Sequence, residues 1–210
     1  MSAILDAILT TRVIAIVRLE RYDYAVEVAR ALVEGGVSSV EFTLTGEGAN
    51  EGISAARTAL GDQAQIGVGT VLSPADAEAA IAAGAQFVVT PVVRPHVIEV
   101  CRKHNVPILC GALTPTEALT AHEAGADMIK IFPARFGGPS YLRDILAPLP
   151  QLRLAPTGGI SSKNMREYFD AGAMAVGIGG NLVSPHAVAQ ENWMHITTAA
   201  QACAVAIKGF

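Results

Sequence analysis

The segment EAGADMIKI (residues 123–131) decides the fold, because the chain repeats its form three more times. A helical pattern ends at a glycine, as helix C-termini commonly require, and a short apolar run follows at once. The other copies are EGGVSSVEF (34–42), AAGAQFVVT (82–90) and DAGAMAVGI (170–178). The interval between copies has room for a strand, a helix, a second strand and a second helix.

Four further apolar runs lie between or beside these copies, at 13–18, 66–71, 106–112 and 152–159. Helical patterns such as SPADAEAAIAAG open with Ser-Pro or Thr-Pro, which is a favourable helix start. Eight apolar strands that alternate with helices are typical of a parallel sheet covered on both faces. The sequence therefore predicts an α/β fold, a single (β/α)8 TIM barrel over residues 1–210 with an extra N-terminal helix. An open doubly wound sheet is the alternative, but it needs a phosphate loop after the first strand, where VRLERYDYA (17–25) has no glycine.

Charge and cysteine content exclude several classes of function. The net charge is −4 and no cluster of Lys and Arg marks a nucleic-acid partner. No apolar run reaches the ~18 residues that a membrane span needs, and the start of the chain reads as an amphipathic helix, not as a signal peptide. Three cysteines without metal-ligand spacing indicate the reducing cytoplasm. The five histidines show no ligand pairing either, so we expect neither a metal nor a cofactor.

One lysine stands within an apolar strand. Lys130 follows Met128 and Ile129 and precedes Ile131 and Phe132, whereas the other three lysines lie in polar or terminal contexts. An ammonium group is costly to bury, and such a lysine tends to lose its proton. A neutral amine can attack a carbonyl and form an imine. The sequence therefore favours an imine-forming lysine over a purely structural ion pair.

A glutamate shares the place of this lysine in the repeat. Counted from the glycine of each copy, the fifth residues are Glu41, Val89, Lys130 and Gly177. Side chains alternate along a strand, so we expect these four to point the same way. If that direction is inward, Glu41 and Lys130 meet near the C-terminal ends of the strands, where barrel enzymes place their chemistry.

Glycine pairs end the last two predicted strands, in PTGGIS (156–161) and GIGGNL (177–182). In barrels of this kind the loops after strands seven and eight commonly bind phosphate through backbone N–H groups. We therefore predict a phosphate site at the two glycine pairs, in preference to simple turns. Arg135 and FGGPSYL (136–142) either cap the site or begin a helix, and the helix start is the favoured interpretation.

The chain resembles the 2-keto-3-deoxy-6-phosphogluconate / 4-hydroxy-2-oxoglutarate aldolase family. The similar motifs run in order through nearly the whole chain as IAIVR, VEFTL, GVGTVL, VTPVV, KIFPA, PTGGI and VGIGGNLV. The resemblance implies a metal-free class I aldolase that acts on a small 2-keto acid, yields pyruvate and an aldehyde, and assembles as a homotrimer.

The resemblance also implies roles for individual residues. Lys130 would form the imine and Glu41 would be the acid and base. Arg18 and Thr70, which end the first and third strands, would contact the pyruvate carboxylate and nearby hydroxyls. The remaining substrate-binding positions that the resemblance implies are Pro91, Phe132, Gly158, Gly159, Gly179 and Gly180.

Two positions depart from the family pattern. Both are substrate-binding positions by the same resemblance. Well-known members have an arginine where Thr45 stands here, and Asn181 replaces a serine that some members use at the phosphate, although an asparagine can still donate a hydrogen bond. The 2-keto-3-deoxy-6-phosphogalactonate aldolases also lack that arginine, so the sequence leaves the substrate epimer open. A phosphosugar isomerase or epimerase that uses Glu41 as base without an imine is a weaker alternative, and a barrel that only binds phosphosugars is weaker still.

Overall fold

Seven parallel strands form one curled sheet in the computed structural model, which describes residues 2–209. The strands are β1 (Val13–Val17), β2 (Ser39–Thr43), β3 (Gln65–Gly69), β4 (Val88–Val89), β5 (Ile108–Ala112), β6 (Met128–Ile131) and β7 (Val176–Ile178). Their order is β6-β5-β4-β3-β2-β1-β7, so that the last strand pairs with the first. An open doubly wound sheet reverses its strand order at a switch point, and this sheet does not. The doubly wound alternative is therefore wrong.

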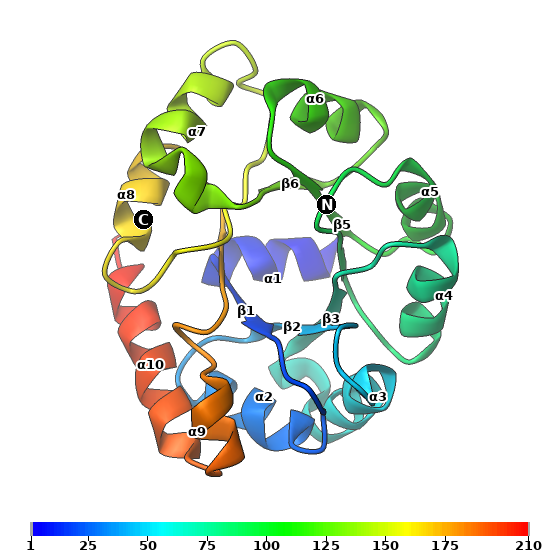
Figure 1. Ribbon diagram of the computed structural model, residues 1–210, viewed down its shortest axis with the longest axis vertical. Helices are drawn as coiled ribbons and strands as arrows, with labels where there is room; N and C mark the ends of the chain where they lie inside the picture. The colour runs from blue at the N-terminus through cyan, green and yellow to red at the C-terminus, as the bar shows by residue number, and fades with distance from the viewer. Residues whose placement is uncertain (1, 210) are drawn as a thin grey trace.

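Helices cover the outside of the sheet, and α1 lies within the ring that they form (Figure 1). Their bounds are α1 (Ala3–Thr11), α2 (Ala25–Glu34), α3 (Ala49–Leu60), α4 (Pro74–Ala82), α5 (Pro95–Lys103), α6 (Pro115–Glu123), α7 (Gly138–Leu146), α8 (Met165–Asp170), α9 (Pro185–Ala189) and α10 (Trp193–Ala206). Short 3-10 turns occupy Gly61–Gln63 and Ala134–Phe136. Within residues 2–209, none of the helices has the length and apolar character to cross a membrane.

The predicted helix signals match the structure. Ser73 and Thr114 each form a capping box at the start of a helix whose first residue is proline. The glycines of the four repeats, at 36, 84, 125 and 172, all have φ between 89° and 103°, a left-handed conformation that few other residues adopt. The repeat therefore ends α2, α4, α6 and α8 and starts β2, β4, β6 and β7, as predicted.

The segment 152–159 differs from the strand expected there, the seventh of the eight along the chain. It makes only isolated bridges, from Leu154 to β6 and from Thr157 to β7. Pro156 has no N–H group to donate to a ladder, and Gly158 turns the chain with φ 102°. The segment nevertheless lies between β6 and β7, because Ile131 N–H donates to its carbonyls on one side and Gly177 N–H on the other.

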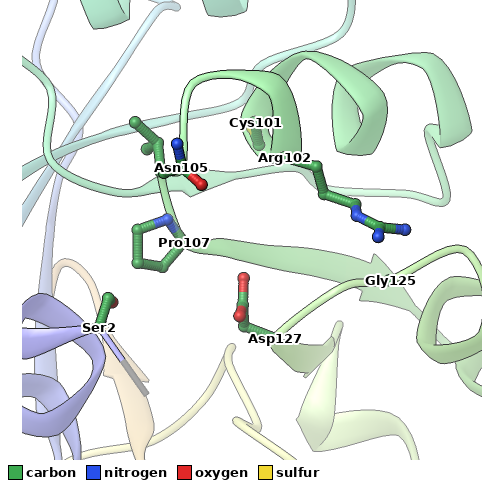
Figure 2. A pocket seen from close by; sticks show the side chains of 8 residues that line it. Ser2, Cys101, Arg102, Asn105, Pro107, Gly125 and Asp127 are labelled. Atoms are coloured by element: carbon green, nitrogen blue, oxygen red, sulfur yellow. The ribbon is translucent and has the colours of Figure 1, made fainter.

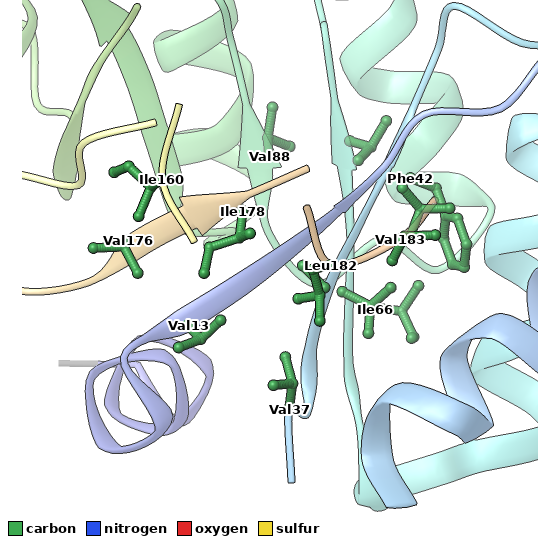
Figure 3. Close-up of a cluster of buried hydrophobic side chains, with 14 of the residues drawn as sticks. Val13, Val37, Phe42, Ile66, Val88, Ile160, Val176, Ile178, Leu182 and Val183 are labelled. Carbon is green, nitrogen blue, oxygen red and sulfur yellow. The ribbon is translucent and has the colours of Figure 1, made fainter. Parts of the chain in front are cut away.

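Alternate side chains of each strand enter two different cores. The outer core, between sheet and helices, contains Val13, Phe42 and Val176 among many others (Figure 3). The inner core, inside the curl of the sheet, contains Leu5 and Ile8 of α1 with apolar side chains from the strands. Helix α1 thus fills the N-terminal end of the interior, and polar groups occupy the C-terminal end.

Candidate active site

Glu41 and Lys130 lie side by side on the inner face of the sheet. Lys130 Nζ is 3.8 Å from Glu41 Oε1, and the two side chains are only 6% and 2% exposed. Glycine makes room for the carboxylate, since a Cβ at Gly69 would collide with Glu41. The repeat therefore brings together the two residues that it places in equivalent positions.

Burial dominates the electrostatics of this pair. Removal from water raises the pKa of the Glu41 carboxyl above its usual range, although the charges of Lys130 and Arg18 act in the opposite direction. Glu41 Oε1 has no hydrogen-bond donor within the described residues. A buried acceptor without a partner is costly, so this oxygen is available to a hydroxyl of a bound ligand. A raised pKa moves a carboxyl towards the range in which general acids and bases work best.

Pro91 and Phe132 flank the lysine. The ring centroid of Phe132 is 5.5 Å from Lys130 Nζ. Gly111 pairs with Lys130 in the sheet, and a Cβ at this glycine would collide with the backbone of Pro91. The missing side chain therefore lets the loop after β4 pack beside the position of the lysine.

A cavity of about 410 Å³ opens at the C-terminal ends of β1, β6 and β7. The predicted site residues that line it are Arg18, Phe132, Gly158, Gly159, Gly179, Gly180 and Asn181. The described residues of its lining include two arginines and no carboxylate. The backbone N–H groups of Gly159, Gly180 and Asn181 have no acceptor among residues 2–209. Free N–H donors beside unopposed positive charge are suited to bind an anion.

The side chain of Asn181 contacts the other glycine loop. Its side-chain Nδ2 donates a hydrogen bond to the Ile160 carbonyl at 2.9 Å, which ties the two glycine loops together. One side-chain N–H therefore serves the structure, and only the second is left for a ligand.

Thr45 and Thr70 lie outside the cavity lining. Thr45 lines an adjacent cavity of about 660 Å³ that shares Arg18 with the first, and its hydroxyl is 2.8 Å from that of Thr43. Thr70 directly follows β3 and adopts φ 60°. Glu41 and Lys130, which are buried, and Pro91 are also not part of the lining of the cavity of about 410 Å³.

Two lining residues with polar side chains, Thr157 and Arg135, were not among the predicted site residues. Thr157 is buried, and Gly177 makes room for its hydroxyl, since a Cβ there would meet Thr157 Oγ1. Its place directly before the glycine pair was the available signal. For Arg135 the favoured interpretation was the start of a helix, and α7 does begin nearby at Gly138, but Arg135 itself lines the cavity.

A third cavity, of about 380 Å³, lies at the opposite end of the strands (Figure 2). Asp127 in its lining accepts a hydrogen bond from Ile108 N–H at 2.9 Å and so caps the start of β5. Burial raises the pKa of Cys101 to about 12, which makes this thiol a poor nucleophile. Nowhere in the described range 2–209 do three or more His, Cys, Asp or Glu side chains gather as metal ligands.

The chain is similar to one protein family over most of its length. The family model of KDPG and KHG aldolase matches residues 4–199. The 2-dehydro-3-deoxy-phosphogluconate aldolase of Treponema pallidum (strain Nichols) is 38% identical over 203 residues, which are 96% of each chain. The 2-dehydro-3-deoxy-6-phosphogalactonate aldolase of Escherichia coli (strain K12) is 36% identical over 80% of this chain and 83% of its own.

Among solved structures, KDPG aldolase from Legionella pneumophila, with pyruvate captured at low pH as a covalent carbinolamine intermediate, has a TM-score of 0.87. It is 30% identical, and the match covers 94% of this chain and 96% of that one. The chain belongs to the KDPG and KHG aldolase family.

Proposed function

We propose that this chain is a class I aldolase that cleaves 2-keto-3-deoxy-6-phosphogluconate, 4-hydroxy-2-oxoglutarate or both. The products are pyruvate and an aldehyde, glyceraldehyde 3-phosphate or glyoxylate, and the reaction is reversible. The observation that carries the proposal is the buried Lys130–Glu41 pair, 3.8 Å apart beside a cavity with two arginines and no carboxylate. The family relationship and the carbinolamine reported for the Legionella pneumophila structure support the same chemistry.

The proposed reaction uses the lysine as an electron sink. The neutral amine of Lys130 attacks the C2 carbonyl, and the carbinolamine loses water to give an iminium. The C3–C4 bond breaks, its electron pair moves into the iminium to form an enamine, and the C4 hydroxyl proton is lost as the aldehyde leaves. The enamine is protonated at C3, and hydrolysis releases pyruvate and regenerates the amine. Glu41 is the group that moves these protons.

The binding residues follow from the same arrangement. We propose that Arg18 and Thr70 contact the pyruvate carboxylate and that Pro91 and Phe132 enclose the imine. The glycine pairs 158–159 and 179–180, with Asn181, hold the phosphate. Free N–H groups at Gly159 and Gly180 support this assignment.

The galactonate epimer is a second candidate substrate. Thr45 stands where well-known gluconate enzymes have arginine, and its hydroxyl joins Thr43 beside a cavity that contains Arg18. The similarity to the phosphogalactonate aldolase of Escherichia coli supports the same candidate. Initial rates with both phosphorylated epimers will decide between them.

We propose three further properties of the chain. The bridges at Leu154 and Thr157 support a closed (β/α)8 barrel in which the segment 152–159 supplies the remaining strand, between β6 and β7. The homotrimer rests on the family resemblance and is tested by light scattering. The buried free thiols Cys101, Cys110 and Cys203 support a cytoplasmic location, where thiols stay reduced.

Covalent trapping tests the central step. Borohydride added with pyruvate should inactivate the protein and add a pyruvate-derived mass to the peptide that contains Lys130. Replacement of the exposed Lys103 by Arg should leave the labelling unchanged. A label on Lys163 or Lys208 in place of Lys130, or no label at all, would exclude the imine mechanism and favour the isomerase alternative.

A further inference from the structure

Arg135 is held directly over the glycine loop by the backbone. Ala134 N–H donates to the Thr157 carbonyl at 2.7 Å, and Arg135 N–H donates to the Gly158 carbonyl at 3.1 Å. These bonds join the 3-10 turn Ala134–Phe136 after β6 to the loop that follows Thr157. The position of the arginine relative to the glycines is therefore set by the fold.

The stem of the arginine crosses Gly159. A Cβ added to this glycine would lie 2.9 Å from Arg135 Cβ and 3.7 Å from its Cδ. Both residues line the cavity of about 410 Å³. The side chain of Arg135 therefore lines the same cavity as the free N–H groups of Gly159 and Gly180.

The charge of Arg135 has no internal partner. Neither Arg135 nor Arg18 forms an ion pair with any acidic side chain of the described residues. The two cations occupy different positions. Arg18 lies near Glu41, where its charge opposes the rise in the pKa of that carboxyl, whereas Arg135 lies over Gly159. A substrate that carries one carboxylate and one phosphate has an anion for each of them.

We propose that Arg135 binds the phosphate of the substrate and makes this aldolase selective for phosphorylated 2-keto acids, an inference that rests on the proposed function. Backbone N–H groups supply neutral donors, and the guanidinium supplies the charge and a planar pair of N–H donors that match phosphate oxygens. A substrate without phosphate leaves Arg135 in water, where it is already solvated. Its removal therefore affects one substrate class and spares the other.

The test compares two substrates that differ only in the phosphate, 2-keto-3-deoxy-6-phosphogluconate and 2-keto-3-deoxygluconate. Arg135→Gln should lower kcat/KM for the phosphorylated substrate by about 10-fold or more, the usual effect of losing a charged hydrogen bond. The value for the unphosphorylated substrate should stay the same. Arg143→Gln removes an equal charge from an exposed position on α7 outside the cavity lining and should change neither value. Arg135→Lys should restore part of the loss, because it keeps a cation.

Equal losses with both substrates would overturn the proposal, and so would an unchanged kcat/KM in Arg135→Gln. Pyruvate labelling of Lys130 in the same variants separates this inference from the proposed function, because pyruvate has no phosphate. If pyruvate and borohydride do not label Lys130 in the wild-type protein, the aldolase proposal fails. Calorimetry then measures the binding of inorganic phosphate, which tests the role of Arg135 independently of the reaction. Weaker phosphate binding by Arg135→Gln than by the wild type supports the assignment, and equal binding rejects it.

Discussion

Lys130 Nζ and Glu41 Oε1 are 3.8 Å apart, which is too far for a hydrogen bond. This carboxylate oxygen accepts no hydrogen bond from any group within residues 2–209. The two groups are therefore close enough to act on one ligand atom but are not satisfied by each other. A substrate oxygen placed between them bonds to both. The unsatisfied carboxylate oxygen lowers the stability of the free protein. A ligand that donates a hydrogen bond to this oxygen removes that cost.

The first prediction concerns proton transfer. Glu41→Gln keeps the shape of the side chain and removes the titratable group, so kcat for cleavage should fall by about 10² to 10⁴. Labelling of Lys130 by pyruvate and borohydride should survive in part, because amine attack needs less proton transfer than cleavage does. The matched control is Glu34→Gln, at an exposed site at the end of α2. A Glu41→Gln variant with near-wild-type turnover would remove the glutamate from the mechanism.

The second prediction concerns stability and pH. Burial raises the pKa of Glu41 above the ordinary value of 4.5, so the native protein holds this proton more tightly than the unfolded chain does. The resulting stabilisation is complete below the unfolded pKa and is lost as the pH rises through the folded pKa. The free energy of unfolding of the wild type should therefore fall, relative to that of Glu41→Gln, as the pH rises above about 4.5.

Urea titrations between about pH 4 and pH 8 measure that difference. The Glu34→Gln variant serves again as control, since its carboxyl is exposed. A wild type that gains stability relative to Glu41→Gln over this range would mean that attraction by Lys130 and Arg18 outweighs the burial of Glu41.

The periodic part of the fold was predictable because local chemistry determines it. A left-handed glycine after a helix and an apolar run of strand length need no knowledge of distant residues, and all four copies of the repeat fold as expected. The exception is 152–159, where apolar character suggested a full strand. Pro156 and the turn at Gly158 limit it to isolated bridges.

The site was predictable where position in the repeat fixes direction. Glu41 and Lys130 share one repeat position, and strand alternation sends both inward. Arg135 follows a strand without regular spacing, so its direction depends on the hydrogen bonds that Ala134 and Arg135 donate to Thr157 and Gly158, beyond α7 in the sequence. Those contacts are tertiary, and no local pattern reveals them.

The third prediction concerns metal. An iminium on Lys130 accepts the electrons of the broken bond, so the proposed mechanism needs no Lewis acid. Dialysis against EDTA should leave the cleavage rate unchanged. The measurement is a coupled assay that reports pyruvate, run with and without added Mg²⁺, Mn²⁺ or Zn²⁺. Activity that disappears with chelator and returns with one of these ions contradicts the class I assignment.

The fourth prediction concerns the glycine loops, and Gly180 allows the sharpest test of them. Its φ is not in the left-handed region, and a Cβ built there meets no atom within 4 Å. Gly180→Val therefore places a side chain in the open cavity without backbone strain or a clash. At Gly159, by contrast, φ is 82° and a Cβ would meet Arg135, so Gly159→Val combines obstruction with strain.

We expect Gly180→Val to unfold within about 0.5 kcal/mol of the wild type, as substitutions without packing consequences usually do. Lys130 labelling by pyruvate should be unchanged, because the lysine lies on another strand. The KM for 2-keto-3-deoxy-6-phosphogluconate should rise, while that for 4-hydroxy-2-oxoglutarate, which has no phosphate, should change far less. Equal losses with both substrates would mean that the glycines shape the interior of the sheet and that the phosphate binds elsewhere. The pyruvate chemistry at Lys130 would stand, since it depends on the buried pair and not on the loops.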